Sequence, residues 1–209
     1  MGIILTETNS EIEAKIKKAI ASHINMSLKK NVPNIQSSCK QLAGEWMMAQ
    51  PELASLVSGD PNSLAGLFGI PSGQVASAVN AIVTSVQESV SVVFDIFDKS
   101  LKGTLEIRFQ PSGFENLLSL PSGRVIYEKG VLHWLNWLLT LGSSPIIANY
   151  HYEANPGTGR SGLGTMKVGS SFRVPIDFAG TLDDNFVTRA LIGKAQEKAI
   201  GDLLMGYLK

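Results

Sequence analysis

The hydrophobic pattern at the start of the chain is helical. Apolar residues recur at helical spacing and predict a helix from about Ser10 to Lys30. Ser10 and Glu13 match the S-x-x-E capping box, which satisfies unpaired amides at a helix start. The predicted apolar side consists of Ile12, Ile16, Ile20, His23 and Leu28. Pro33 then predicts a break, because proline cannot donate the helical hydrogen bond.

Further helical patterns follow this break. A second helix is predicted from Ile35 to Gln50 and is stopped by Pro51. Its buried side is formed by Leu42, Trp46 and Met47. The stretch 51–71 is rich in Gly and Pro, which predicts only short helices there. An amphipathic helix is predicted from Ser72 to Gln87, with Val75, Val79, Ile82, Val83 and Val86 on its apolar side.

The period then changes from that of a helix to that of a strand. Alternating residues from Ser89 to Phe97 and from Thr104 to Phe109 predict an antiparallel hairpin with one buried face. The connection between these strands is polar and ends on Gly103. A short strand is predicted from Gly123 to Glu128, followed by a helix from Val131 to Leu141.

More alternating segments occupy the next part of the chain. A strand is predicted from Ile146 to Glu153, followed by a Gly-rich hairpin loop near 155–164 that we expect to be flexible. The segments Thr165–Val168 and Ser171–Val174 are predicted to pair around Gly169. Together these patterns predict a single α+β domain over residues 1–209, with N-terminal helices, central antiparallel β-hairpins and a long C-terminal helix.

The C-terminal helix is predicted from Asp183 to Leu208 and is expected to be capped by Thr181. It contains small residues that permit close helix packing: Ala190, Gly193, Ala195, Ala199, Gly201 and Gly206. Because each interior glycine costs roughly 1 kcal/mol of helix propensity, such a helix needs tight packing to offset the cost. The packing partner is either the core of the same subunit or a neighbouring subunit.

Charge and composition narrow the classes of function. The 18 basic residues balance the 18 acidic ones, which argues against broad electrostatic binding of nucleic acid. Charged residues make up 17% of the chain, below the usual quarter. Two interpretations remain open: a subunit covered by its neighbours, or an ordinary well-buried domain. The longest apolar run, around 131–141, is too short to span a membrane, and Cys39 has no partner for a disulfide.

Residues that could serve in catalysis or metal binding are scattered along the sequence. His23, His133 and His151 have no second ligand at a metal-binding spacing, and each is interpreted as structural. The string Gly157–Gly162 matches G-x-G-x-x-G, but no helix is predicted after it to bind a pyrophosphate. We therefore predict no catalytic, cofactor-binding or metal-binding residues, and a protein that is not an enzyme.

The C-terminal third carries a family resemblance. It rests on four segments of the sequence: 137–142 (WLLTLG), 159–166 (GRSGLGTM), 172–175 (FRVP) and 178–190 (FAGTLDDNFVTRA). These segments resemble virion proteins of tailed bacteriophages of the neck or tail-completion type. In that group an R-S/T-G-x-(x)-M/L element enters a hairpin and a long helix follows. The first 130 residues match no such pattern.

The resemblance implies a head–tail connector protein that joins head and tail as a ring homo-oligomer, a hexamer or dodecamer. The implied partners are further copies of the chain and adjacent virion proteins such as the connector, tail tube or sheath. DNA would pass through the ring without sequence-specific contacts, and no membrane is involved. The subunit would be made in the host bacterial cytoplasm and end in the virion.

Two other functions remain open: an assembly factor or interaction module absent from the finished particle, and a small nucleotide-binding enzyme using the Gly157–Gly162 loop. The predicted interaction residues are Arg160, Ser161, Gly162, Arg173, Asp184, Arg189 and Gly201. Arg160 is expected to bind an acidic group or backbone carbonyls of a neighbouring subunit. The loop around it is expected to become ordered only in the assembly.

Overall fold

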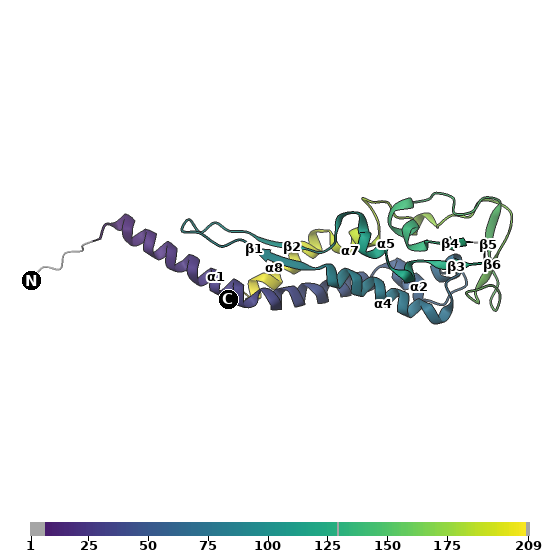
Figure 1. Ribbon diagram of the computed structural model, residues 1–209, viewed down its shortest axis with the longest axis horizontal. Helices are drawn as coiled ribbons and strands as arrows, with labels where there is room; N and C mark the ends of the chain where they lie inside the picture. Colours follow the sequence, from purple (N-terminus) through teal and green to yellow (C-terminus); the bar gives the residue numbers. More distant parts are fainter. Residues whose placement is uncertain (1–6, 129, 208–209) are drawn as a thin grey trace, which may run out of the picture.

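The computed structural model describes residues 7–128 and 130–207 and has an α+β architecture, as the sequence predicts. The molecule is elongated (Figure 1). One end is a body of helices and short hairpins. The other is an arm formed by the start of the first helix and a long β-hairpin beside it.

The first helix, α1 (Asn9–Met48), is a single element of 40 residues. The predicted break at Pro33 is wrong, because Pro33 lies inside the helix. A proline removes one helical hydrogen bond and bends a helix, while packing on both sides can hold the helical path. Here Leu28 and Ile35 are both buried, and α1 changes direction part-way along its length (Figure 1).

The capping box of α1 starts two residues earlier than predicted. The Thr8 amide donates to the Glu11 carboxylate at 2.7 Å, and the Glu11 amide donates to Thr8 Oγ1 at 3.3 Å. The Thr8 hydroxyl also donates to the Glu11 carboxylate, and the hydrogen bonds from the Thr8 amide and hydroxyl lower the pKa of Glu11. Ser10 and Glu13 lie inside the helix instead, where Glu13 pairs with Lys17.

Three further helices pack beside the C-terminal part of α1. They are α2 (Pro51–Val57), α3 (Leu64–Phe68) and α4 (Ser72–Ser89). The first two confirm the short helices predicted for 51–71, and α4 matches its predicted range to within two residues. The shared core of these elements includes Ile35, Met47, Leu53, Phe68, Val79, Ile82 and Val86.

The predicted hairpin after α4 is confirmed. Strands β1 (Ser91–Phe94) and β2 (Leu105–Arg108) are antiparallel, with Phe94 opposite Leu105. On its buried face, Val92 is covered and Ile107 half-covered, while Val93 on the other face is exposed. The hairpin runs along α1 and forms the second half of the arm (Figure 1).

The middle of the chain has shorter elements than predicted. After η1 (Ser112–Phe114), α5 (Glu115–Leu118) and η2 (Pro121–Gly123), strand β3 (Val125–Tyr127) pairs with β4 (Gly130–Leu132). The predicted helix 131–141 therefore starts only at α6 (Trp134–Asn136), because its first residues complete the hairpin. It continues as a π-helical segment, η3 (Trp137–Leu141).

The next strand pair differs from the prediction. Strand β5 (Tyr150–Ala154) pairs with β6 (Gly164–Val168) across the Gly-rich loop, so the pairing of 165–168 with 171–174 is wrong. Phe172 instead forms an isolated bridge with Ile147. Alternation identifies a strand but does not choose its partner.

The C-terminal helix is divided into two. After η4 (Ile176–Phe178), α7 (Phe186–Leu191) ends at Ile192, which is extended, and α8 (Lys194–Tyr207) begins beyond Gly193. Asn185 caps α7, rather than Thr181. The last predicted helical residue, Leu208, lies outside the described residues. Helix α8 has no buried residue and is anchored to α1 through Tyr207, whose hydroxyl lies 3.0 Å from Ser38 Oγ.

Candidate interaction surfaces

One side chain of α1 forms two hydrogen bonds with the hairpin of the arm. Asn25 accepts a hydrogen bond from the Phe97 amide at 2.8 Å and donates to the Phe97 carbonyl at 2.9 Å. The Phe97 ring in turn covers Gly103, where an added Cβ would lie 2.6 Å from the ring. These contacts fix the hairpin to α1 beyond the main core.

One face of the arm helix carries exposed isoleucines. Ile16 is 54% and Ile20 43% exposed. Residues Ala21 and Leu28 are buried and mark, with Asn25, the face turned to the hairpin. At about 100° per residue, Ile16 and Ile20 lie roughly 100° or more around the helix from that face. The predicted apolar side is therefore wrong as a single buried face: Ile16 and Ile20 point outward, whereas Leu28 lies on the buried side of the helix.

A second apolar surface is a groove of ≈ 500 Å³ on the body. Segment 109–114 forms one wall, and segment 182–192 forms the other. The lining is mainly apolar: Phe109, Pro111, Phe114, Leu182, Val187, Leu191 and Ile192. Leu182 and Ile192 are 55% and 74% exposed, so the groove is accessible.

The groove wall contains an unusual backbone position at Phe114. This residue has φ 57° and ψ 29°, in the left-handed region, and its side chain is buried. A bulky residue there costs on the order of 1–3 kcal/mol, so the surrounding packing must hold it in place. The chain passes at this residue from the first groove wall into α5, which begins at Glu115.

Asp183 places a carboxylate in the lining of the groove. Glu115 directly follows the lining residue Phe114 in the chain, and both acidic residues are exposed. Neither forms an ion pair with another described residue. Asp184 is also exposed, but it pairs with Arg189 at 2.7 Å. The groove is thus mainly apolar, with an acidic side chain in its lining.

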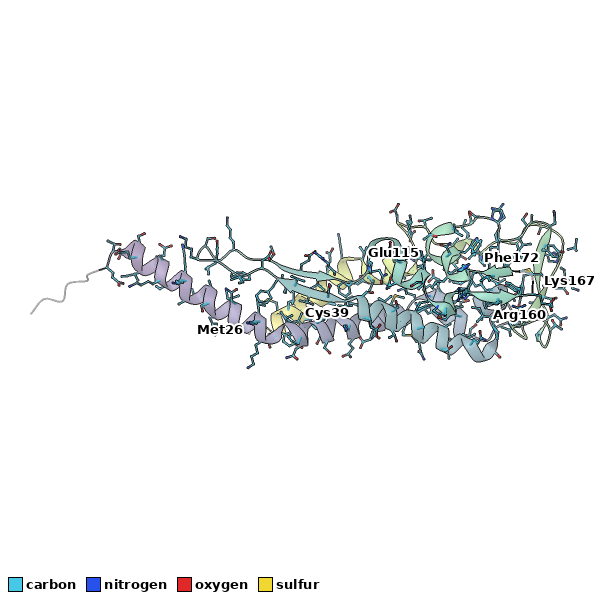
Figure 2. The ribbon with its side chains drawn as sticks, in the orientation of Figure 1. Met26, Cys39, Glu115, Arg160, Lys167 and Phe172 are labelled. Carbon is cyan, nitrogen blue, oxygen red and sulfur yellow. The ribbon has the colours of Figure 1, made fainter. Side chains whose placement is uncertain are left out.

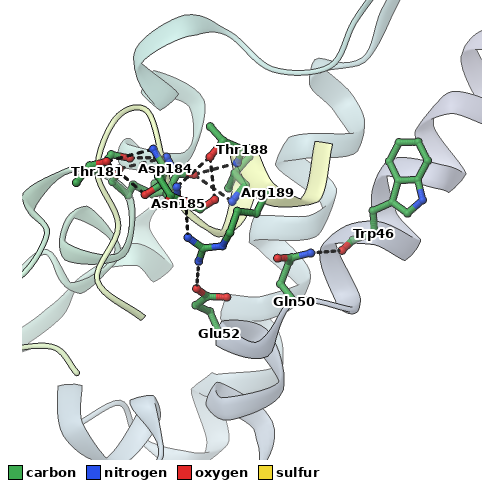
Figure 3. A network of polar contacts seen from close by, with 10 residues as sticks. Trp46, Gln50, Glu52, Thr181, Asp184, Asn185, Thr188 and Arg189 are labelled. Atoms are coloured by element: carbon green, nitrogen blue, oxygen red, sulfur yellow. Dashed lines mark hydrogen bonds and ion pairs between the residues drawn. The ribbon is translucent and has the colours of Figure 1, made fainter. Parts of the chain in front are cut away.

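Arg189 connects two carboxylates of different exposure (Figure 3). One guanidinium nitrogen donates to Asp184 and another donates to Glu52 in α2. Glu52 is fully buried, and its Oε2 has no hydrogen-bond partner among the described residues. Burial raises the pKa of the Glu52 carboxyl, and Arg189 opposes that rise only in part. The ion pair therefore fastens α7 to α2 inside the chain.

Asn185 holds the segment 178–190 in place through hydrogen bonds of its side chain. Its side-chain oxygen accepts from the Val187 and Thr188 amides at 3.0 and 3.1 Å. Its amide nitrogen donates to the carbonyls of Leu139 and Thr181 at 3.3 and 2.7 Å. Asn185 thus both caps α7 and joins it to the π-helical segment. This fully buried residue was absent from the sequence-predicted site (Figure 3).

Close packing against Leu138 requires a glycine at position 180 in the same segment. An added Cβ would collide with the Leu138 carbonyl. Asp184 and Arg189, predicted as interaction residues, form an ion pair with each other, and their contact with another subunit stays a prediction. The segment that carries the family resemblance is, in this structure, mainly a packing motif.

Arg160 also has partners within its own chain. Its guanidinium donates to the Ile126 carbonyl and lies 4.2 Å from the centroid of the Tyr127 ring. Arg160 thus finds the predicted type of acceptor, a backbone carbonyl, but on β3 of its own chain. A contact to a neighbouring subunit stays a prediction.

The Gly-rich loop is closed by its own hydrogen bonds. The Asn155 amide donates to the Leu163 carbonyl at 3.0 Å, and the Gly157 amide donates to the Gly162 carbonyl at 2.7 Å. Ser161 is buried and its Oγ accepts from the Leu163 amide. Because the loop joins two antiparallel strands, it lacks the strand–loop–helix geometry of a dinucleotide site. Its mobility stays a prediction.

The remaining predicted residues lie apart from one another. Arg173 donates to the Ser143 carbonyl at 2.9 Å. Gly201 is exposed, and an added Cβ would meet nothing within 4 Å. The hypothesis that Gly201 packs against its own core is therefore wrong; packing against a neighbour is untested.

The described residues contain no group of three or more His, Cys, Asp or Glu side chains placed to hold a metal ion. His23 and His133 are exposed, and His151 is half-buried on β5. In the same part of the chain, no helix has the length and apolar character needed to cross a membrane.

Comparisons of this chain with models of protein families, with curated proteins and with solved structures give no match. The arm and the groove therefore have to be interpreted from their own geometry. The sequence indicated the spacing of Ile12, Ile16 and Ile20 but not their exposure, and it did not indicate the groove, whose two walls are roughly 70 residues apart in the chain.

Proposed function

We propose that this chain is a structural subunit of a tailed-bacteriophage particle, of the neck or tail-completion type, that acts as a ring homo-oligomer joining head and tail. The observation that carries the proposal is the arm. A 40-residue helix extends beyond the body (Figure 1). Its outer part exposes Ile16, Ile20 and Met26, of which Met26 is labelled in Figure 2. Apolar side chains on a projecting helix are typical of a surface that a partner covers.

The exposed arm indicates a protein that binds a partner, and the sequence resemblance specifies the type of protein. Segments 159–166 and 178–190 resemble neck and tail-completion proteins, and a low fraction of charged residues suits a subunit with covered surfaces. The proposed partners are further copies of this chain and adjacent virion proteins such as the connector, tail tube or sheath. DNA would pass through the ring opening.

Two measurements test this function. Sedimentation velocity and native mass spectrometry of the full chain should give one closed oligomer, with a ring visible by negative-stain electron microscopy. Mass spectrometry of purified phage particles from the source of this sequence should then detect the chain. A chain that is present during assembly but missing from finished particles would support an assembly factor instead. A chain that stays monomeric at high concentration and is missing from particles would overturn the proposal.

A further inference from the structure

We propose that the arm of one subunit docks into the groove of the next, so that the ring is built head to tail from this single contact. The isoleucine stripe of α1 would fill the apolar groove between segments 109–114 and 182–192. This inference rests on the proposed function and names the partner of the exposed arm: a second copy of this chain.

The two surfaces match in chemistry. The stripe presents aliphatic side chains four residues apart, Ile16 and Ile20, with Ile12 half-covered one turn earlier. This spacing is the one that helices use when they bind in apolar grooves. The groove offers aromatic and aliphatic walls, of which Leu182 and Ile192 are the exposed edges.

The two surfaces also match in charge. Between Glu7 and Lys30 the arm has five lysines and three glutamates, so this part of it carries two net positive charges. Asp183 lines the groove, Glu115 directly follows the lining residue Phe114 in the chain, and neither has an ion-pair partner among the described residues. Opposite charges at the rim favour encounter and fix the register of docking.

The charge of the arm also argues against its pairing with another arm. Two arms side by side would bring together two surfaces with two net positive charges each, which like-charge repulsion disfavours. The groove offers the opposite sign. The preferred occupant of the groove is therefore an arm, and the preferred partner of an arm is a groove.

A subunit cannot reach its own groove. The second groove wall includes α7, which the Arg189–Glu52 pair fastens just beyond the C-terminal end of α1. Ile16 lies 32 residues before Met48, or about 48 Å along a helix of 1.5 Å rise. Figure 2 likewise shows Met26 on the arm and Glu115 on the body, well separated along the long axis. Only another subunit can bring the two surfaces together.

A contact between two different surfaces of identical subunits is heterologous. Such contacts produce a closed ring when the rotation between subunits closes, and an open filament when it does not. The arm and groove therefore supply the type of interface that a ring requires, whereas pairing of identical surfaces would end at a dimer.

Thiol cross-linking of the full chain tests this docking. The native Cys39 is buried, so Ile16→Cys and Ile192→Cys each add one accessible thiol to a chain without another. With a short bismaleimide reagent, a mixture of the two variants should give a cross-linked dimer, and neither variant alone should. Val168→Cys, on the exposed β6 position, replaces Ile192→Cys as the matched control and should give no product.

Association strength gives a second readout. Ile16→Asp should weaken self-association about a hundredfold, because an aliphatic anchor becomes a charge in an apolar groove. The double change Glu115→Lys and Asp183→Lys should weaken it roughly three- to tenfold, and added salt should reduce that difference. All three positions are exposed, so circular dichroism and melting of each variant should match the parent chain.

The outcomes separate the inference from the proposed function. Cross-linking of Ile16→Cys to itself would show arm–arm pairing and overturn the inference. A ring that forms in the Ile16→Asp variant with parental affinity would overturn it as well, while leaving the proposed function standing. A parent chain that never oligomerises and is missing from particles would overturn both.

Discussion

The two halves of α1 have the same secondary structure but opposite surroundings. In the C-terminal half, Ile35, Cys39, Ala43 and Met47 are fully buried and form part of the central core. In the N-terminal half, buried side chains are confined to the strip that faces the hairpin, and Ile16 and Ile20 are exposed. Helical periodicity therefore tells which residues share a face, but not whether the same chain covers that face.

This contrast separates folding from assembly. Changes in the body should alter the stability of the isolated chain, whereas changes on the outer face of the arm should alter association and leave folding intact. Four further experiments, from the largest expected effect to the smallest, examine where this boundary lies.

The largest effect is expected in the core of the body. Trp134 is fully buried, and its ring centroid lies 5.7 Å from that of Phe68. Trp134→Ala should lower the free energy of unfolding by about 3–5 kcal/mol, since it leaves a large cavity. The matched change on the arm, Ile16→Ala, should stay within about 0.5 kcal/mol. Urea unfolding measures the free energy of unfolding of both variants. Equal losses in the two variants would contradict the distinction between the body and the outer face of the arm.

The next effect is expected at the buried ion pair. Arg189→Met leaves the buried Glu52 carboxylate without its partner and should lower the free energy of unfolding by about 2–4 kcal/mol at pH 7. The loss is smaller than that of a fully buried ion pair would be, because the Arg189 side chain is 38% exposed. Burial raises the pKa of Glu52 above its ordinary 4.5. The protonated carboxyl needs no cation, so the loss should shrink as the pH falls through the folded-state pKa toward 4.5.

The sign follows from linkage. A carboxyl with a raised folded-state pKa favours folding below its unfolded pKa, and this contribution is lost as the pH rises through the folded value. Glu52→Gln, alone and with Arg189→Met, is the control and should remove this pH dependence. Unfolding by urea between pH 4 and 8 measures it. A loss in Arg189→Met that does not vary with pH would contradict the assignment to Glu52.

A smaller effect is expected where the arm leaves the body. Pro33 lies inside α1, where proline is about 3 kcal/mol less favourable for the helix than alanine. Proline also lowers the conformational entropy of the unfolded chain, and this stabilising effect offsets part of the cost. Pro33→Ala should raise the free energy of unfolding by about 1–2 kcal/mol and straighten the arm. Small-angle scattering would detect the straightening. A loss of stability would mean that the bend is needed to hold the hairpin against α1.

The smallest effect is expected on α8. Gly201→Ala should raise the free energy of unfolding by up to about 1 kcal/mol, because the added methyl group meets no neighbour and alanine favours the helix. Gly180→Ala is the contrasting control and should destabilise the chain, since its Cβ would collide with the Leu138 carbonyl. Thermal unfolding of both variants measures the difference. Destabilisation by Gly201→Ala would show that α8 packs more tightly than its exposure indicates.

Local patterns predicted the elements that depend on neighbouring residues. The valine and isoleucine spacing from Val75 to Val86 defined α4, and alternation on both sides of Gly103 defined the β1–β2 hairpin. Both signals are local, because a helix or a tight hairpin forms its hydrogen bonds between residues close in the sequence. The spacing of Ile12, Ile16 and Ile20 was visible in the same way, but their exposure was not.

The sequence alone determined the α+β class, most of the helices and the apolar stripe at the start of α1, because periodicity and local hydrogen bonding encode them. The tertiary structure decided the rest. Packing on both sides of Pro33 continued one helix where the sequence indicates two, and pairing across the Gly-rich loop selected β5 as the partner of β6. It also brought Arg189 to Glu52 and closed the groove between segments 109–114 and 182–192. These contacts join residues far apart in the chain, and no local pattern specifies which distant segments meet.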